Sequence, residues 1–352
     1  MIGKSVTNVL HPNEIVIKDS QALTKSERRN YPLKDNLKIG LALGSGSSRG
    51  WSHIGIIKEL ASLGVTPDIV CGTSVGAMVG AAYLTNNIDK LEDWALSVTK
   101  FDVAKFLNIN ASMTGFLDSE RFHTFLNENI AMDTINIEAL QKPFAAVSTD
   151  LESGREIWLK KGPLIQAVCA SMSMPGLFPA IRHDKTWLVD GGLVNPVPVS
   201  VCRSLGADIV IAVNLNGDIV GKHFRKKMEK EAEMKASQTV IDDAEEASDG
   251  RAQSSLGGKF TDLVREYANF SFLDSSDKEQ PPSLLNAIAA SINITQDRIT
   301  RSRIAGDPPD IIFSPRLSDI GLLELHRADE AILEGRRCVQ RHLSEVEYIF
   351  GL

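Results

Sequence analysis

The chain has no excess of basic residues. Its 38 Lys and Arg are outnumbered by 45 Asp and Glu, which gives a formal net charge of −7 over 352 residues. A protein that binds nucleic acid through the phosphates needs a basic face. The charge balance therefore argues against nucleic acid as a partner.

Cysteine is scarce and scattered. The sequence has four cysteines and no C-x-x-C pair or Cys/His cluster; they are Cys71, Cys169, Cys202 and Cys338. Zinc sites and disulfide frameworks need closely spaced ligands or cysteine-dense chains. We expect reduced, mostly buried thiols in a cytoplasmic protein, with no metal and no other cofactor.

Long apolar runs are absent as well. No stretch reaches the roughly 18 apolar residues of a membrane-spanning helix, and residues 1–20 lack the apolar centre of a signal peptide. We expect a cytoplasmic protein, with a peripheral contact to the inner face of a membrane left open. The length suits one large α/β domain or two ordinary ones.

Buried strands and helices alternate through the middle of the chain. Residues 38–43 predict a strand, residues 53–63 a helix and residues 68–71 a second strand. A strand–helix–strand unit with a short crossover predicts a parallel pair. Further strands are expected at 144–148, 156–159, 187–189, 208–215 and 310–313, and further helices at 163–172, 199–205, 284–304 and 327–349.

Two polar regions flank this pattern. Residues 1–36 are expected to form an N-terminal extension, and residues 37–352 one domain with a polar insertion at about 216–282. Within the insertion, residues 260–273 carry an apolar stripe. The stripe suits packing on the domain or a partner chain, or a membrane surface.

The segment CGTSVGAMVG at 71–80 contains G-x-S-x-G, with Ser74 between Gly72 and Gly76. An apolar run precedes it and small helix-compatible residues follow it. This context is typical of a nucleophile elbow, where a strained strand-to-helix turn exposes the serine hydroxyl. The same pattern also arises by chance in glycine-rich chains.

The loop GSGSSRG at 44–50 follows the first strand. It lacks the lysine of a P-loop, and its third glycine is one residue late for a dinucleotide fingerprint. Since parallel strands end at one edge of the sheet, this loop and Ser74 should be neighbours. The amides near Gly46 and Ser47 could then form an oxyanion hole, with added positive charge from Arg49.

A nucleophilic serine needs a base. His326 and His342 are the late histidines that a Ser–Asp–His order would require, but both stand in helical surroundings. Asp190, in LVDGGLVNPVP, ends a strand before Gly191 and Gly192. Asp-Gly-Gly is also an ordinary turn signal, so the pattern alone leaves both interpretations open.

The motifs GSGSSRG, GTSVGA and DGG, in this order, resemble the patatin-like phospholipase family, most closely its bacterial branch related to neuropathy target esterase. SMSMPGLFPA and the segment from LVDGG to AVNL are similar to that branch too. The resemblance covers residues 37–215 and, more weakly, 283–345. It implies a three-layer α/β/α fold with a mainly parallel central sheet, and hydrolysis of acyl esters in lipids.

The resemblance also implies residue roles. Ser74 would be the nucleophile and Asp190 the base of a dyad without histidine, with an oxyanion hole from Gly46 and Ser47 ahead of Arg49. The supporting motif glycines would be Gly44, Gly50, Gly72, Gly76, Gly191 and Gly192. The family loop typically has three glycines, and Ser45 and Ser47 depart from it, which restricts the loop's backbone angles.

Several alternatives stay open. The chain could be a catalytically weak regulator or scaffold on the same fold, or an acyltransferase that shares the acyl-serine step. Apolar residues at 113–117 and 172–178 suit either an acyl channel or ordinary core. Asp150, at another strand end, suits a turn cap better than catalysis.

Overall fold

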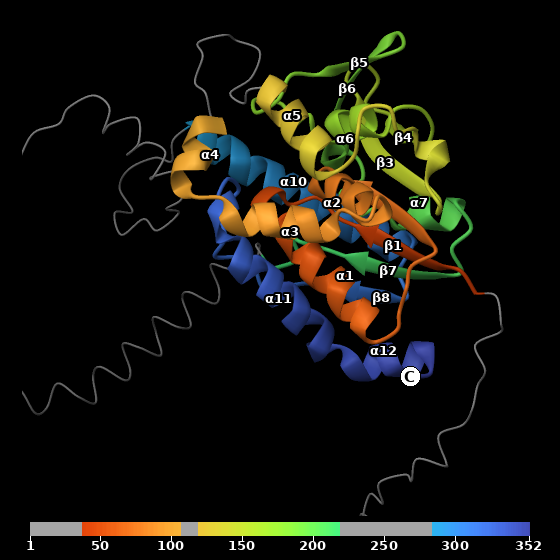
Figure 1. Cartoon of the computed structure of the whole chain (residues 1–352). Helices are drawn as coiled ribbons and strands as arrows, with labels where there is room; N and C mark the ends of the chain where they lie inside the picture. Colours follow the sequence, from red (N-terminus) through yellow and green to blue (C-terminus); the bar gives the residue numbers. More distant parts are fainter. Residues whose placement is uncertain (1–36, 107–118, 219–283) are drawn as a thin grey trace, which may run out of the picture.

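The central feature of the fold is one eight-stranded sheet with helices on both faces (Figure 1). The structure is a computed structural model, and it describes residues 37–106, 119–218 and 284–352. The expected extension at 1–36, nearly all of the insertion with its stripe at 260–273, and the whole channel candidate at 113–117 lie outside the described residues.

The strands run in the order β5-β6-β3-β2-β1-β7-β8, with β4 on the free side of β3. All pairings among β3, β2, β1, β7 and β8 are parallel, whereas β4, β5 and β6 pair antiparallel. The strands are β1 (Ile39–Leu43), β2 (Ile69–Thr73), β3 (Phe144–Asp150), β4 (Glu156–Leu159), β5 (Ile181–His183), β6 (Thr186–Asp190), β7 (Ile209–Val213) and β8 (Ile311–Phe313).

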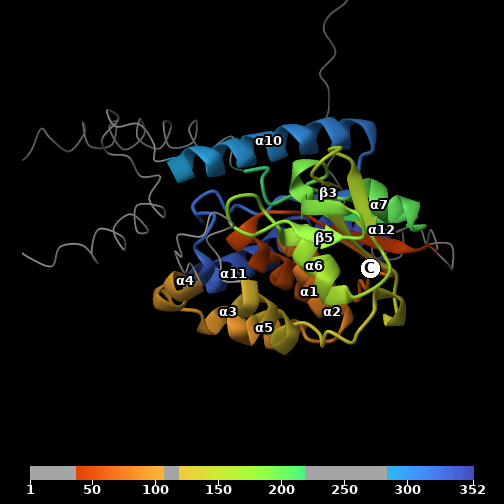
Figure 2. The ribbon, with the colours of Figure 1, turned by 90° about the horizontal axis from the view of Figure 1, so that it is seen from above.

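Helices cover both faces of the sheet, as Figure 2 shows, with α7 and α10 on one side and α1, α2, α3 and α6 on the other. The helices are α1 (Ser52–Ser62), α2 (Val75–Leu84), α3 (Ile88–Ser97), α4 (Lys100–Phe106), α5 (Ser119–Asn129), α6 (Leu164–Met172), α7 (Val199–Ser204), α10 (Leu284–Gly306), α11 (Ala328–Arg341) and α12 (Leu343–Phe350). Short 3-10 turns are η1 (Ser47–Trp51), η2 (Ile137–Ala139), η3 (Gly191–Leu193) and η5 (Leu325–Arg327).

The strand sequences explain this layering. Successive side chains of a strand point to opposite faces of the sheet. In β1, Leu41 and Leu43 pack into the large core beneath α1 and α2, whereas Ala42 packs into the smaller core beneath α7. Parallel strands covered on both faces are apolar throughout, which is why IGLAL and IVCGT read as continuous apolar runs.

The expected α/β/α fold with a mainly parallel sheet is confirmed. Two local features differ from the sequence prediction: the strand β5 was not predicted, and the expected helix at 327–349 is two helices separated at His342. The expected strand at 187–189 is present and runs antiparallel to both of its neighbours. The expected helix at 284–304 extends to Gly306.

Candidate active site

Ser74 lies on a sharp turn between β2 and α2. Its backbone has φ 57° and ψ −125°, a region that non-glycine residues rarely adopt and that costs about 1–3 kcal/mol. Its amide donates to Ser171 Oγ at 2.9 Å, and Ser171 Oγ donates in turn to the Val147 carbonyl at 2.5 Å. The turn is therefore held by α6 and β3 together.

The two glycines of G-x-S-x-G are needed for close approach. A Cβ on Gly72 would come within 2.4 Å of the Ala77 nitrogen, and a Cβ on Gly76 within 2.1 Å of the Leu43 carbonyl oxygen. Real Cβ contacts are not that short, so a side chain at either position would push α2 away from the sheet. The pattern therefore reflects a steric requirement of this turn.

Asp190 reaches Ser74 because β6 runs antiparallel. Along β3, Val147 pairs with Thr73 of β2, and the next residue, Ser148, pairs with Asp190 of β6. Since β4 pairs with these same two β3 residues, it occupies the opposite edge, and β2 and β6 share one edge end to end. The carboxyl ends of β2 and β6 therefore meet, although the strands run in opposite directions.

The two side chains are hydrogen-bonded in a buried setting. Ser74 Oγ donates to Asp190 Oδ2 at 2.6 Å, and the Gly192 amide donates to Asp190 Oδ1 at 2.7 Å. Ser74 is 6% exposed and Asp190 is 1% exposed. Burial raises the pKa of Asp190 to about 6, although both hydrogen bonds act to lower it. Asp190 is thus ionised at neutral pH and more basic than an exposed aspartate.

The glycine loop and the serine turn line the same pocket. Ser47, like Ser74, has a positive φ (51°), so one of the two serines that replace loop glycines adopts a backbone conformation that glycine favours. In the described part of the chain, neither the Gly46 nor the Ser47 amide donates to a protein acceptor. Val75 begins α2, where a helix leaves its first amides without intrahelical acceptors.

Arg49 lies behind the loop and is not among the residues that line the pocket. It is 2% exposed, and its Nε donates to the Gly46 carbonyl at 3.2 Å. Its Nη2 donates to Asn293 Oδ1 on α10 at 3.0 Å. Burial lowers the pKa of Arg49 to about 10, which still leaves the guanidinium charged at neutral pH.

The remaining motif glycines lie around this centre. Gly44 accepts from Nε2 of His53 at 2.8 Å, which gives that buried histidine a structural contact behind the loop. A Cβ on Gly50 would contact Val75, and one on Gly191 would contact the Val147 carbonyl. The glycines therefore keep the glycine loop, the serine turn and the Asp190 turn in close contact.

The other candidate residues lie elsewhere. Asp150 caps a turn: it accepts from the Ser153 hydroxyl at 2.8 Å and from the Glu152 amide at 3.0 Å. His342 Nδ1 contacts the Cys338 carbonyl, and neither His342 nor His326 lines the pocket with Ser74. Within the described residues, no group of His, Cys, Asp and Glu is arranged to hold a metal ion.

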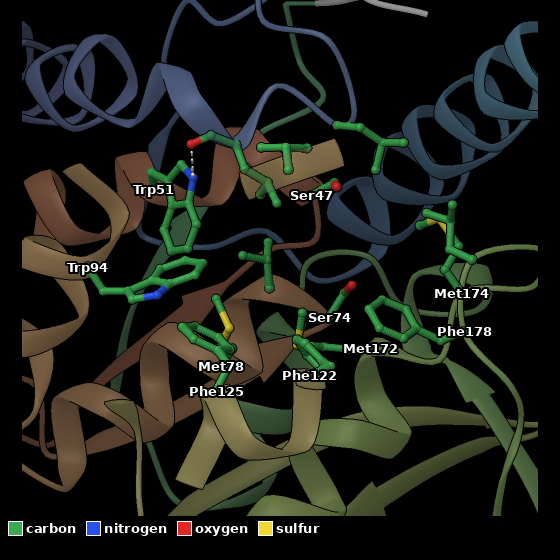
Figure 3. A pocket seen from close by; sticks show the side chains of 15 residues that line it. Ser47, Trp51, Ser74, Met78, Trp94, Phe122, Phe125, Met172, Met174 and Phe178 are labelled. Carbon is green, nitrogen blue, oxygen red and sulfur yellow. Dashed lines mark hydrogen bonds between the residues drawn. The ribbon is translucent and has the colours of Figure 1, made fainter. Parts of the chain in front are cut away.

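An apolar pocket of about 100 Å³ opens beside Ser74 (Figure 3). Aromatic and methionine side chains from α2, α3, α5 and the 172–178 segment surround it, and the Ser74 hydroxyl points into it. The lining residues are Ser47, Trp51, Ser74, Val75, Met78, Trp94, Val103, Phe122, Phe125, Met172, Met174, Leu177, Phe178, Leu323 and Leu325.

Some contributors to the site were not found from the sequence. Ser171 and Asn293 act through single side-chain contacts, and no motif marks them. The Val75 amide could be predicted from the elbow motif, since such turns offer the amide of the residue after the nucleophile as an oxyanion donor.

Among the helices that the structure describes, none combines the length and the apolar character that spanning a membrane requires.

Comparison with known proteins agrees with the motifs. Residues 41–203 match the family model described as patatin-like phospholipase. An uncharacterised NTE family protein of Mycobacterium tuberculosis is 29% identical over 335 residues, covering 88% of this chain and 92% of the relative. Patatin-like phospholipase domain-containing protein 6 of Homo sapiens is 33% identical over 184 residues, and protein 7 of Mus musculus is 35% identical over 185 residues.

The two mammalian matches cover 50% of this chain and 13% of those longer proteins. Among solved structures, VipD from Legionella pneumophila aligns with a TM-score of 0.33 and 14% identity, over 88% of this chain and 77% of VipD. So low a score supports no statement about this chain. The motif resemblance is nevertheless confirmed by sequence: residues 41–203 match the patatin-like phospholipase model, and the chain is similar to proteins of the NTE family.

Proposed function

We propose that the chain is a serine hydrolase that cleaves carboxylic esters of lipids, with Ser74 as nucleophile and Asp190 as base. The match of residues 41–203 to the patatin-like phospholipase model, with the similarity to the NTE family, supports lipid acyl hydrolase activity in general. The observation that carries the specific proposal is the 2.6 Å contact between Ser74 Oγ and Asp190 Oδ2 beside an apolar pocket.

The two carboxylate oxygens of Asp190 have different partners, which supports different roles for them. Asp190 Oδ1 is held by the Gly192 amide, so Oδ2 remains to take the Ser74 proton as Oγ attacks the ester carbonyl. A carboxylate near pKa 6 is better matched to this transfer than one near 4, because general-base catalysis improves as the pKa approaches the working pH.

The developing oxyanion would meet backbone amides and a helix terminus. Ser47 and Val75 line the pocket beside Ser74, Gly46 directly precedes Ser47, and α2 begins at Val75. Unpaired amides and the helix dipole both favour negative charge at such a terminus. Each donor of this kind is worth about 3–4 kcal/mol in related sites.

The rest of the cycle follows from the pocket. The acyl chain would lie along the aromatic and methionine lining while the alcohol leaves with the proton held by Asp190. Water, deprotonated by Asp190, would then attack the acyl-serine and release the fatty acid. Acyl transfer to another alcohol would use the same acyl-serine, so product analysis with a competing lysolipid separates the two.

The test compares wild type, Ser74→Ala and Asp190→Asn on p-nitrophenyl esters of graded acyl length, with fluorophosphonate labelling of each. We expect turnover and labelling in wild type, neither in Ser74→Ala, and a rate reduced by at least about 100-fold in Asp190→Asn, as for loss of a general base. Asp150→Asn and Ser62→Ala are matched controls, since neither side chain contacts Ser74, and both should behave as wild type.

Full activity in Ser74→Ala would make the nucleophile assignment wrong. A folded wild type that neither turns over nor labels would favour the regulator or scaffold alternative.

A further inference from the structure

Helix α10 lies outside the segment 41–203 that matches the family model and on the opposite side of the sheet from α2 (Figure 2), yet it contacts the glycine loop. Two of its side chains make these contacts, Asn293 and Gln296. Residues three apart share one face of a helix. A single face of α10 therefore reaches the loop at two points.

The first point joins Gln296 to Ser45. Gln296 is 2% exposed, and its Oε1 accepts from Ser45 Oγ at 2.9 Å and from Asn216 Nδ2 at 2.9 Å. Ser45 is 1% exposed and directly precedes Gly46. A buried hydroxyl that loses its acceptor is left without a hydrogen bond that water could replace, so this contact fixes the loop against α10.

Gln296 also lies against the Asp190 turn. A Cβ built on Gly192 would come within 2.3 Å of Gln296 Nε2, 2.9 Å of Asp190 Oδ1 and 3.0 Å of Ser45 Oγ. These three side chains therefore converge on the space beside Gly192, which only a glycine leaves open. One amide side chain thus contacts both the loop that would hold the oxyanion and the turn that carries the base.

The second point acts through Arg49. Asn293 Oδ1 accepts from the Arg49 guanidinium, and Arg49 gives Nε and its own amide to the Gly46 carbonyl, both at 3.2 Å. The Gly46 carbonyl and the Ser47 N–H belong to one planar trans peptide and point in opposite directions. Holding the carbonyl toward Arg49 therefore fixes the direction of the Ser47 N–H on the other side.

We propose that Gln296 and Asn293 of α10 are positioning residues, which hold the glycine loop in the orientation that stabilises the oxyanion beside Ser74. The inference rests on the proposed function, and it assigns part of the catalytic geometry to an element beyond the matched family segment. Neither residue lines the pocket beside Ser74; each acts through Ser45 or Arg49.

The experiment uses the full chain with Gln296→Met, Asn293→Ala, Ser45→Ala and the double variant Ser45→Ala/Gln296→Met. Arg298→Ala is the control, because Arg298 is an exposed residue of the same helix. Kinetics on p-nitrophenyl butyrate give kcat and KM, and the fluorophosphonate labelling rate reports the serine directly. Amide hydrogen exchange of the peptide covering residues 44–50 reports the loop without any need for turnover.

We expect Gln296→Met and Asn293→Ala each to lower kcat and the labelling rate at least about tenfold, because a misaligned donor loses part of the 100- to 1,000-fold worth of an oxyanion contact. KM should stay within about twofold, since transition-state contacts leave ground-state binding unchanged. Loop exchange should rise in both. Arg298→Ala should match wild type in every measurement.

Ser45→Ala removes only the hydrogen bond from Ser45 to Gln296 and leaves the contact of Gln296 with Asn216 in place. It therefore tests the same contact if Gln296→Met fails to fold. It should lower kcat in the same direction, and the double variant should add little to Gln296→Met, because both remove one contact. Unchanged loop exchange, or a changed KM with kcat intact, would overturn the proposal. If wild type were inactive but amide exchange of the loop rose in the variants, the proposed function would be contradicted. The inference that Gln296 and Asn293 hold the loop would still be supported.

Discussion

At the scale of single residues, the burial of the Asp190 carboxylate sets both its strength as a base and its contribution to the pH dependence of stability. Asp190 accepts two hydrogen bonds and is almost fully buried, yet burial outweighs them and holds its pKa at about 6. An aspartate in an unfolded chain titrates near 3.9. The folded protein therefore binds a proton on Asp190 at a pH where the unfolded chain does not.

This difference predicts opposite pH trends for stability and activity. Between pH 4 and 6 the folded state holds more protons than the unfolded state, so the contribution of Asp190 to the free energy of unfolding falls as pH rises through 6. From pH 7 to pH 4, wild type should gain up to about 3 kcal/mol relative to Asp190→Asn, from a difference of about two pKa units. Urea unfolding of both proteins at several pH values measures it.

Activity should move the other way. Below pH 6 the base is protonated, so kcat/KM should fall about tenfold per pH unit. For the stability measurement, Asp150→Asn is a matched control with the opposite expected trend. The Ser153 hydroxyl holds the pKa of Asp150 below its usual range, so the contribution of Asp150 to the free energy of unfolding is present at neutral pH and is lost on acidification. A wild type and Asp190→Asn pair with parallel stability curves would contradict the assignment of the pKa.

The turns at Ser74 and Asp190 could be predicted from sequence because each stands in a local motif, and local motifs report local backbone geometry. The catalytic roles of the two residues belong to the proposed function. Gln296 could not be predicted, because its function depends on contacts with Ser45, 251 residues earlier. A single buried glutamine in a helix has no pattern that distinguishes it from a solvated one. Its role emerges only when the chain brings α10 against the loop.

At the scale of elements, the direction of β6 is a feature that could not be predicted from the sequence. The apolar run at 187–189 predicts a strand that ends at Asp190. The same run is compatible with either direction, since strand periodicity does not encode orientation. The missed strand β5 forms the hairpin that turns the chain around, and three residues are too few to give a periodic signal.

The pair of helices α1 and α11 provides the next prediction. A Cβ on Gly55 would lie 2.0 Å from the Ile332 carbonyl oxygen, and a Cβ on Gly335 would lie 2.1 Å from the Ser52 carbonyl oxygen. The two helices therefore cross with backbone in contact with backbone. Neither oxygen can move aside like the end of a flexible side chain.

Gly335→Ala should destabilise the protein by about 1–3 kcal/mol, the usual cost of overpacking, even though alanine favours a helix more than glycine does. Gly306→Ala is the control, because nothing lies within 4 Å of a Cβ at that exposed end of α10. Chemical unfolding of both variants measures the effect. A Gly335→Ala protein as stable as Gly306→Ala would mean that the helices can separate at no cost.

At the scale of the whole molecule, the sheet extends well beyond the matched segment. The strand β7 pairs with β1, and β8 pairs with β7, although both follow residue 203. Helix α11 packs its buried face into the same core as β1 and α1. We therefore propose that the domain runs from residue 37 to residue 352, as its composition suggested, with the polar insertion between β7 and α10.

The shape of the pocket gives the last prediction, about acyl-chain length. Met78 stands one turn of α2 beyond Ser74 and lines the pocket between the serine and the Trp94 side (Figure 3). It is 2% exposed, so a bulkier ring there would occupy space needed by the distal part of a chain. Short chains would not reach it.

Met78→Phe should therefore lower kcat/KM for p-nitrophenyl esters of long acyl chains at least about tenfold, since each excluded methylene forfeits about 0.8 kcal/mol of burial. Activity on the acetate and butyrate esters should stay within about threefold, because Ser74, Asp190 and the loop amides are untouched. Met132→Phe is the control, since Met132 is 65% exposed and lies outside this pocket. Equal losses on short and long esters would show that Met78 supports the serine turn rather than bounding the chain, and an unchanged profile would place the acyl chain elsewhere.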